Sequence, residues 1–217
     1  MCPTSDSDRR SGRPTDEHKT QRILEAAHSL LSELGLFGTS MEAVAAKAGV
    51  AKTTLYARFA DKNALLEAVI DWVVTPFEEV ERLEASNRSI RDALNGYGFY
   101  LASAVENARI SGLEPAILVS SSQNKYIARM FHKKGPGRVR ELLSSAMAEW
   151  CEQERLSKHD ETDTAERMAE DLLSLWRGLF SIEMRLEHAG PPPPELIRAR
   201  IERGTDRFLH LYGTPLS

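Results

Sequence analysis

Helical periodicity is the feature that most constrains this chain, because its apolar residues recur at three- and four-residue spacing. The first such run forms one stripe of an amphipathic helix, made of Ile23, Leu24, Ala27, Leu30, Leu31 and Leu34. No segment alternates apolar and polar residues for long enough to require a sheet. The sequence therefore predicts an all-α fold of nine or ten helices.

Capping signals mark where the first helices begin and end. Gly35 follows the first stripe at the position where a helix commonly ends with positive φ. Thr39 and Glu42 stand three residues apart, which predicts a capping box at the start of a second helix. Gly49 ends that short helix, and Asp61 is placed to cap a fourth.

A third short helix is expected from about Ala51 to Phe59, with Leu55 and Phe59 facing inward. Further stripes predict helices over about 90–108, 115–134, 136–155, 163–188 and 195–211, with a polar loop at 156–162. Pro115 and Pro136 are each expected in the first turn of their helix.

Several protein classes are excluded by composition. Cys2 and Cys151 lie almost the whole chain apart, which excludes a disulfide scaffold. The histidines show no pairing at metal-ligand spacing, so no metal site and no cofactor is expected. The longest apolar run contains Glu67 and Asp71, which argues against a membrane span. The N-terminus lacks the apolar core of a secretory signal, so a cytoplasmic protein is expected.

The formal net charge of −4 argues against DNA as a partner until it is divided along the chain. Residues 9–62 carry nine Lys or Arg against six Asp or Glu, an excess of three positive charges. Residues 63–217 carry nineteen basic and twenty-four acidic residues, an excess of five negative charges. This asymmetry permits a nucleic-acid partner for the N-terminal part.

Three helices in residues 20–60, with a tight turn at Gly49 between the last two, form a helix-turn-helix pattern. The N-terminal residues of the third helix of such a motif reach base edges in the major groove. Its outward positions hold Lys52, Thr53, Thr54 and Tyr56, whose ammonium and hydroxyl groups suit bases and phosphates.

The segment ILEAAHSLLSELGLFGTSMEAVAAKAGVAKTTLYARFADKNALLEAVI resembles the DNA-binding domain of the TetR family of transcriptional regulators. The likeness includes the ILEAA opening, the glycine break, the AGV turn and the TLY pattern, and it runs from about Arg22 to Ile70. The later segment SSSQNKYIARMFHKKGPGRVRELLSSAMAEW is similar to the AefR-like C-terminal domain of that family. The resemblance implies a repressor that a small hydrophobic ligand releases from its operator.

The resemblance also assigns Thr39, Ser40 and Lys62 to phosphate contacts. Ala51 stands where the family usually has a capping serine, and Arg58 is an additional candidate for phosphate. Arg9, Arg10 and Arg13 are expected on a flexible arm that lies in the minor groove or along phosphates; a solvated terminus is the alternative. The expected domains are the arm at 1–18, the DNA-binding domain at 19–65 and a ligand-binding and dimerisation domain at 66–217.

Aromatic and sulfur side chains on the middle helices are the pocket candidates, although most such residues in any protein are core. They are Trp72, Phe99, Tyr100, Met130, Phe131, Met147, Trp150 and Trp176. The last two helices carry apolar stripes wider than one core face needs, which predicts a homodimer on a palindromic operator of double-stranded DNA. Their interface candidates are Leu172, Leu175, Leu179, Ile182, Ile197, Ile201 and Phe208.

Three alternatives remain open at this point. Cys151 could make the chain a thiol-redox regulator, or it could pair with His159 in a hydrolase-like enzyme, although an inert buried cysteine is the commoner case. A helical interaction module that never touches DNA is the third. The preferred interpretation is a regulator that is not an enzyme.

Overall fold

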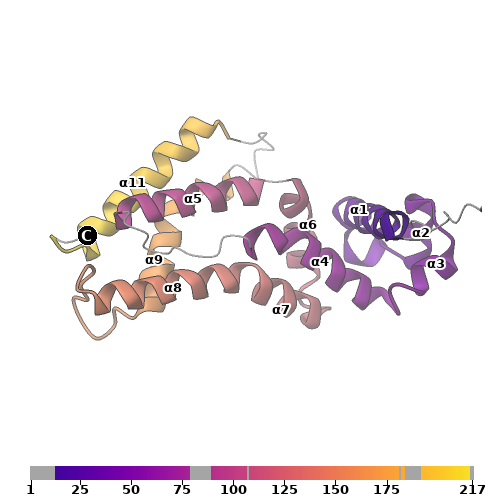
Figure 1. The fold of residues 1–217 in the computed structure, drawn as a ribbon, viewed down its shortest axis with the longest axis horizontal. Helices are drawn as coiled ribbons and strands as arrows, with labels where there is room; N and C mark the ends of the chain where they lie inside the picture. Colours follow the sequence, from indigo (N-terminus) through magenta and orange to yellow (C-terminus); the bar gives the residue numbers. More distant parts are fainter. Residues whose placement is uncertain (1–12, 79–88, 107, 181, 184–191, 216–217) are drawn as a thin grey trace, which may run out of the picture. The chain divides into compact units, whose positions relative to one another are not determined.

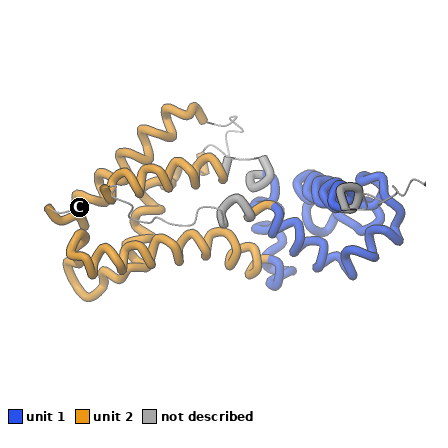
Figure 2. Tube along the Cα trace, in the orientation of Figure 1, with its two compact units in different colours: residues 1–72, 112–127 blue, residues 73–111, 128–217 orange. Residues whose placement is uncertain are grey.

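The computed structural model describes residues 13–78, 89–106, 108–180, 182–183 and 192–215. Within these ranges the chain is helical and contains no β-strand, so the all-α prediction is confirmed (Figure 1). One isolated antiparallel bridge joins Leu156 to Gly213. Two compact units can be separated, an N-terminal unit of residues 1–72 and 112–127 and a C-terminal unit of 73–111 and 128–217 (Figure 2).

The N-terminal unit contains α1 (Arg13–Gly38), α2 (Met41–Ala48), α3 (Lys52–Tyr56) and the first part of α4 (Lys62–Glu78). It also takes in most of α6 (Ala108–Ser120) and the start of α7 (Lys125–Lys134). Its core closes on a void of only about 10 Å³, lined by Leu31, Leu36, Leu66, Ile70, Leu113, Ala116, Ile117 and Ile127. The segment 112–127 therefore packs with the first helices, and the expected domain boundaries at residues 19 and 66 stay predictions.

The C-terminal unit is built on α5 (Ile90–Glu106), α8 (Pro136–Glu152), α9 (Ala165–Arg177) and α11 (Pro194–Tyr212). In it α9 packs against both α8 and α11, and α5 packs against α11. Trp176 is buried at the junction of α5, α9 and α11, where Gly98 and Gly204 let the helices approach closely. The indole N–H of Trp176 donates to Thr205 Oγ1 at 3.1 Å.

Several capping predictions are confirmed. Gly35 breaks α1 with φ 70°, and Gly49 ends α2 in the left-handed region with φ 63°. Asp61 Oδ1 accepts the N–H of Ala64 at 2.9 Å, which caps α4. Pro136 opens α8 as expected. These two glycine breaks and the start at Pro136 could be predicted because each depends on a local backbone preference.

The predicted capping box at Thr39 is wrong by one residue. Ser40 is the cap of α2, and its Oγ accepts the N–H of Ala43 at 3.1 Å. Thr39 is buried, and its hydroxyl donates to the carbonyl of Gly35 at 2.9 Å. Thr39 therefore uses its hydroxyl to close the end of α1, which leaves the cap of α2 to its neighbour.

Three predicted helix limits are also wrong. The third helix ends at Tyr56, because residues 57–58 form a turn before the buried Phe59. Pro115 lies inside α6, and a turn at 121–124 separates that helix from α7, whose first turn is capped by Asn124.

The expected helix 163–188 is broken after Arg177. Residues 180 and 182–183 are helical again, and 184–188 lie outside the described residues. Gly178 adopts φ 47° and ψ −151°, which no continuing helix allows. Arg200 closes the end of α9, because its Nε and Nη2 donate to the carbonyls of Trp176 at 2.7 Å and Arg177 at 2.9 Å. The apolar stripe alone did not reveal this break, since Gly178 offers no side chain to interrupt it.

Candidate nucleic-acid interface

The turn between α2 and α3 has the geometry of a helix-turn-helix (Figure 1). One face of α2 is buried, and it consists of Met41, Val44, Ala45 and Ala48. Gly49 then reverses the chain, and its N–H donates to the carbonyl of Ala46 at 3.1 Å. The backbone reaches α3 within three residues, so α3 is held at an angle to α2 and projects from the unit.

The recognition helix α3 has one buried side chain and several exposed ones. Leu55 is completely buried and anchors the helix to the core. Lys52 and Thr53 are exposed, Thr54 is half-buried, and Tyr56 is 46 % exposed. Ala51 leaves the helix without a side-chain cap, as its sequence predicts. The exposed set offers an ammonium group and hydroxyls on one short surface, which suits contacts to bases and phosphates.

Lys52 is available to a phosphate at small cost. Its Nζ lies 3.6 Å from a carboxylate oxygen of Glu42, and both side chains are more than half exposed. An exposed ion pair of this kind contributes little, because water and salt screen it. A phosphate can therefore replace Glu42 as the partner of Lys52.

Two residues assigned to phosphate are held inside the unit. Arg58 is half-buried; its Nε donates to Thr20 Oγ1 at 3.2 Å and its Nη1 to the carbonyl of Thr54 at 3.3 Å. Lys62 donates to the carbonyl of Leu36, and burial lowers the pKa of its ammonium group. These bonds tie both side chains to their own unit and use part of their donor capacity.

The remaining predicted DNA contacts include one buried and one exposed side chain. Thr39 is buried with its hydroxyl in use, whereas Ser40 is exposed at the start of α2. Arg9 and Arg10 lie outside the described residues, as does the side chain of Arg13. The predicted contact residues that the structure leaves exposed are therefore Ser40, Lys52, Thr53 and Tyr56.

Arg22 on α1 was missed by the sequence reasoning. Its Nη2 donates to the carbonyl of Ala48, with a longer contact of 3.4 Å to that of Gly49. These are the carbonyls of the last residue of α2 and of the first residue of the turn, so Arg22 holds the backbone just before α3. The only signal in the sequence is a single arginine one residue before the first apolar stripe.

Half of the eight pocket candidates lie in the core. Four are buried (Phe131, Met147, Trp150 and Trp176) and four are half-buried (Trp72, Phe99, Tyr100 and Met130). The ring of Trp72 meets His28 edge-on at 6.0 Å, and the guanidinium of Arg198 lies 4.6 Å over the ring of Phe99. None of the eight lines the void of the N-terminal unit or the depression on α11 described next.

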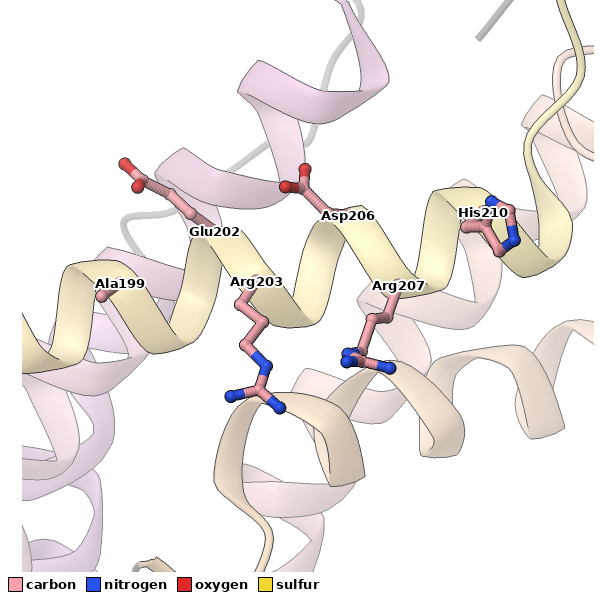
Figure 3. A pocket seen from close by; sticks show the side chains of 6 residues that line it. All are labelled: Ala199, Glu202, Arg203, Asp206, Arg207 and His210. Carbon is pink, nitrogen blue, oxygen red and sulfur yellow. The ribbon is translucent and has the colours of Figure 1, made fainter.

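The dimer candidates are of two kinds. Leu172, Ile201 and Phe208 are buried in the core of their own chain, so they have no area left to bury against a second copy. Leu175 and Ile197 are half-buried, whereas Leu179 is 71 % and Ile182 47 % exposed. The solvent side of α11 carries an open depression of about 490 Å³, lined by Ala199, Glu202, Arg203, Asp206, Arg207 and His210 (Figure 3).

The residues considered for an enzyme do not form a catalytic pair. Cys151 is half-buried, and burial raises the pKa of its thiol while nearby Lys158 lowers it to a smaller extent. His159 lies against the C-terminal end of α11, where its Nε2 contacts the carbonyl of Leu211. In the described ranges no group of three or more His, Cys, Asp or Glu is arranged to hold a metal ion. No helix there is long and apolar enough to cross a bilayer.

Known family models match two parts of the chain. Residues 23–69 match the family model described as bacterial regulatory proteins, tetR family. Residues 104–214 match the model of the AefR-like transcriptional repressor, C-terminal domain. The second match alone covers just over half of the 217 residues.

Individual relatives agree with these matches. The chain is 40 % identical over 57 residues to the uncharacterized HTH-type transcriptional regulator YvdT of Bacillus subtilis. The matched residues cover 26 % of this chain and 29 % of YvdT. It is 29 % identical over 133 residues to the HTH-type transcriptional regulator EthR of Mycobacterium tuberculosis. That match covers 55 % of this chain and 62 % of EthR. Less than two thirds of either relative is therefore matched. The solved structure of the flavonoid-responsive regulator FrrA superposes with TM-score 0.75 at 25 % identity, covering 92 % of this chain and 99 % of that one.

Proposed function

Because the chain belongs to the TetR family of bacterial regulatory proteins, we propose that it is a transcriptional repressor that binds a palindromic operator in double-stranded DNA. The family models and the relatives describe transcriptional regulators and not enzymes. A DNA-binding repressor works where the chromosome lies, so the proposed location is the cytoplasm.

The observation that carries this proposal is the surface of α3. Lys52, Thr53 and Tyr56 are exposed around the buried anchor Leu55, directly after a glycine turn. The N-terminal end of a recognition helix contacts base edges, and neighbouring cations and hydroxyls contact phosphates. Ser40 at the start of α2 offers one more exposed hydroxyl in the same motif.

Dimerisation and ligand release complete the proposal. Two copies present two α3 helices to half-sites about one DNA turn apart, which explains a palindromic operator. The exposed Leu179, Ile182, Leu196 and Leu211 support a helical interface formed with a second copy. The inducer is proposed to be a small hydrophobic molecule, a class to which the name of FrrA also points. Binding would shift the population toward dimers whose α3 helices no longer match adjacent grooves.

The helix α4 is the proposed connection between ligand and DNA. Its residues are divided between the two compact units after Trp72, so one continuous helix belongs to both. A helix transmits displacement along its axis because each turn is hydrogen-bonded to the next. Movement at its C-terminal part would therefore reach Asp61 and the turn that precedes it.

The redox and enzyme alternatives lack support. The raised pKa of Cys151 keeps the thiol protonated at neutral pH, which makes it a poor nucleophile. The enzyme alternative also gives no role to the exposed polar side chains of α3.

Footprinting on the DNA upstream of the protein's own gene tests the proposal. We expect one protected, two-fold symmetric region, and we expect protection to weaken when a hydrophobic inducer is added. A protein that protects no region at any concentration up to that of non-specific binding would contradict the repressor and favour the helical interaction module.

A further inference from the structure

The recognition helix α3 has little structure of its own to fix its direction. It has five residues, and no side chain caps its start. Its first turn rests on backbone bonds from Thr54 and Leu55 to the carbonyl of Ala51, at 2.9 and 3.2 Å. Isolated helices of this length are unstable, so the orientation of α3 has to come from groups outside it.

One such group is Arg22, which acts at the turn before α3. It donates to the carbonyls of Ala48 and Gly49. A Cβ atom at Gly49 would lie 2.6 Å from Nη2 of Arg22, so the glycine that provides the positive φ also leaves room for the guanidinium. Arg22 therefore ties α1 to the backbone from which α3 departs.

The second group is Arg58, which acts just after α3. Its Nη1 donates to the carbonyl of Thr54 within α3, and its Nε donates to Thr20 Oγ1 on α1. Thr20 and Arg22 are two residues apart, about 3 Å along the axis of α1. The same stretch of α1 thus holds the chain on both sides of the recognition helix.

We propose that Arg22 and Arg58 are positioning residues that set the angle at which α3 meets the major groove. Neither contacts DNA through its guanidinium, although Arg58 has the residue type of a phosphate ligand. The proposal rests on the proposed DNA-binding function, and it adds two residues that determine specificity from outside the recognition surface. A small error in the angle of α3 misplaces Lys52 and Tyr56 together, so base discrimination is lost before non-specific binding.

Arg22→Met tests the first residue, because methionine keeps a long apolar stem and removes the donors. Lys19→Met is the matched control: Lys19 is exposed on the same helix, makes no hydrogen bond or ion pair among the described residues, and loses the same charge. The probes are the DNA site that the unaltered protein selects from a random pool and poly(dI-dC). We expect Arg22→Met to bind the selected site about five- to tenfold more weakly than Lys19→Met. The two variants should bind poly(dI-dC) equally and show equal salt slopes.

Thr20→Val tests the second residue without removing any charge. We expect it to weaken binding to the selected site by about two- to fivefold at an unchanged salt slope. Arg58→Met should weaken the same binding without lowering the slope by the roughly 0.9 that a lost phosphate contact causes. A slope lower by that amount, in Arg58→Met or in Arg22→Met relative to Lys19→Met, would overturn the proposal in favour of direct phosphate contact.

Amide hydrogen exchange in the free protein keeps the inference testable whether or not DNA is bound. We expect faster exchange in residues 50–57 of Arg22→Met than of Lys19→Met, while the core of the unit exchanges at the same rate. Equal exchange in these residues overturns the positioning role. Failure of the unaltered protein to select any DNA site contradicts the proposed function instead, and the exchange result still decides whether the two arginines hold α3.

Discussion

The two units differ in how their candidate side chains are placed. In the N-terminal unit, Lys52, Thr53 and Tyr56 are exposed around one buried leucine. In the C-terminal unit, Met147 and Trp176, which were predicted for a pocket from their residue types, are buried against their own neighbours. A short helix on a surface has one inward stripe, so periodicity decides which side chains face solvent. A pocket is assembled from several helices, and no single stripe distinguishes its lining from the core.

Trp176 gives the largest expected effect, because the structure makes it part of the core. Trp176→Ala should lower the free energy of unfolding by about 3–5 kcal/mol, measured by urea denaturation. Thr205→Val is the control that removes only the acceptor of the indole N–H, and it should cost about 1 kcal/mol. A loss below about 1 kcal/mol for Trp176→Ala would place the indole against a cavity and restore it as a pocket residue.

Substitutions at two glycines of α5 test how closely the helices of the C-terminal unit approach one another. A Cβ at Gly98 would lie 2.6 Å from Ile201 Cγ2, whereas a Cβ at Gly96 meets nothing within 4 Å. We expect Gly98→Ala to destabilise the protein by about 1–3 kcal/mol through overpacking. Gly96→Ala should instead stabilise it by about 0.5–1 kcal/mol, since alanine favours the helix. Equal thermal shifts in the two variants would contradict the close packing of α5 against α11.

The sequence predicts best those features that depend on residues close together along the chain. Gly35, Gly49 and Asp61 act within one helical turn of their own positions, and all three were predicted correctly. The break at Gly178 has the same local signal, but the apolar stripe continues past it and led the prediction across the break. The part that depends on distant residues is the closure of α9 by Arg200, more than twenty residues away.

The same distinction applies at the interface with DNA. Lys52 and Tyr56 were placed by helical register, which is local. The family resemblance assigned Lys62 to phosphate, and Arg58 was added by its residue type. In the structure they bond to Leu36 and Thr20 on α1, far back in the sequence. A long cationic side chain can reach either a phosphate or a carbonyl, and only the tertiary structure decides which is near.

Lys52→Ala tests whether an exposed side chain of the N-terminal unit contributes to DNA binding and not to stability. Since Lys52 is exposed and weakly paired, its removal should leave the free energy of unfolding within about 0.5 kcal/mol of the unaltered value. Operator affinity should fall by about 1 kcal/mol, roughly fivefold. Lys125→Ala, which removes an exposed lysine at the start of α7, should change neither quantity. Retained operator affinity in Lys52→Ala would remove α3 from the proposed interface.

The smallest expected effect is a gain at the start of α3. Ala51 has φ −66° and ψ 145°, the extended conformation of an N-cap residue, so Ala51→Ser can accept a backbone N–H without rearrangement. We expect it to raise the free energy of unfolding by about 0.5–1 kcal/mol, whereas Ala57→Ser at the other end of α3 should give no gain. If the two serines have the same effect in thermal unfolding, the start of α3 is already satisfied by other groups. A selective gain at residue 51 would show that α3 lacks a cap and is held by its neighbours, whereas α9 begins with a side-chain cap at Thr164.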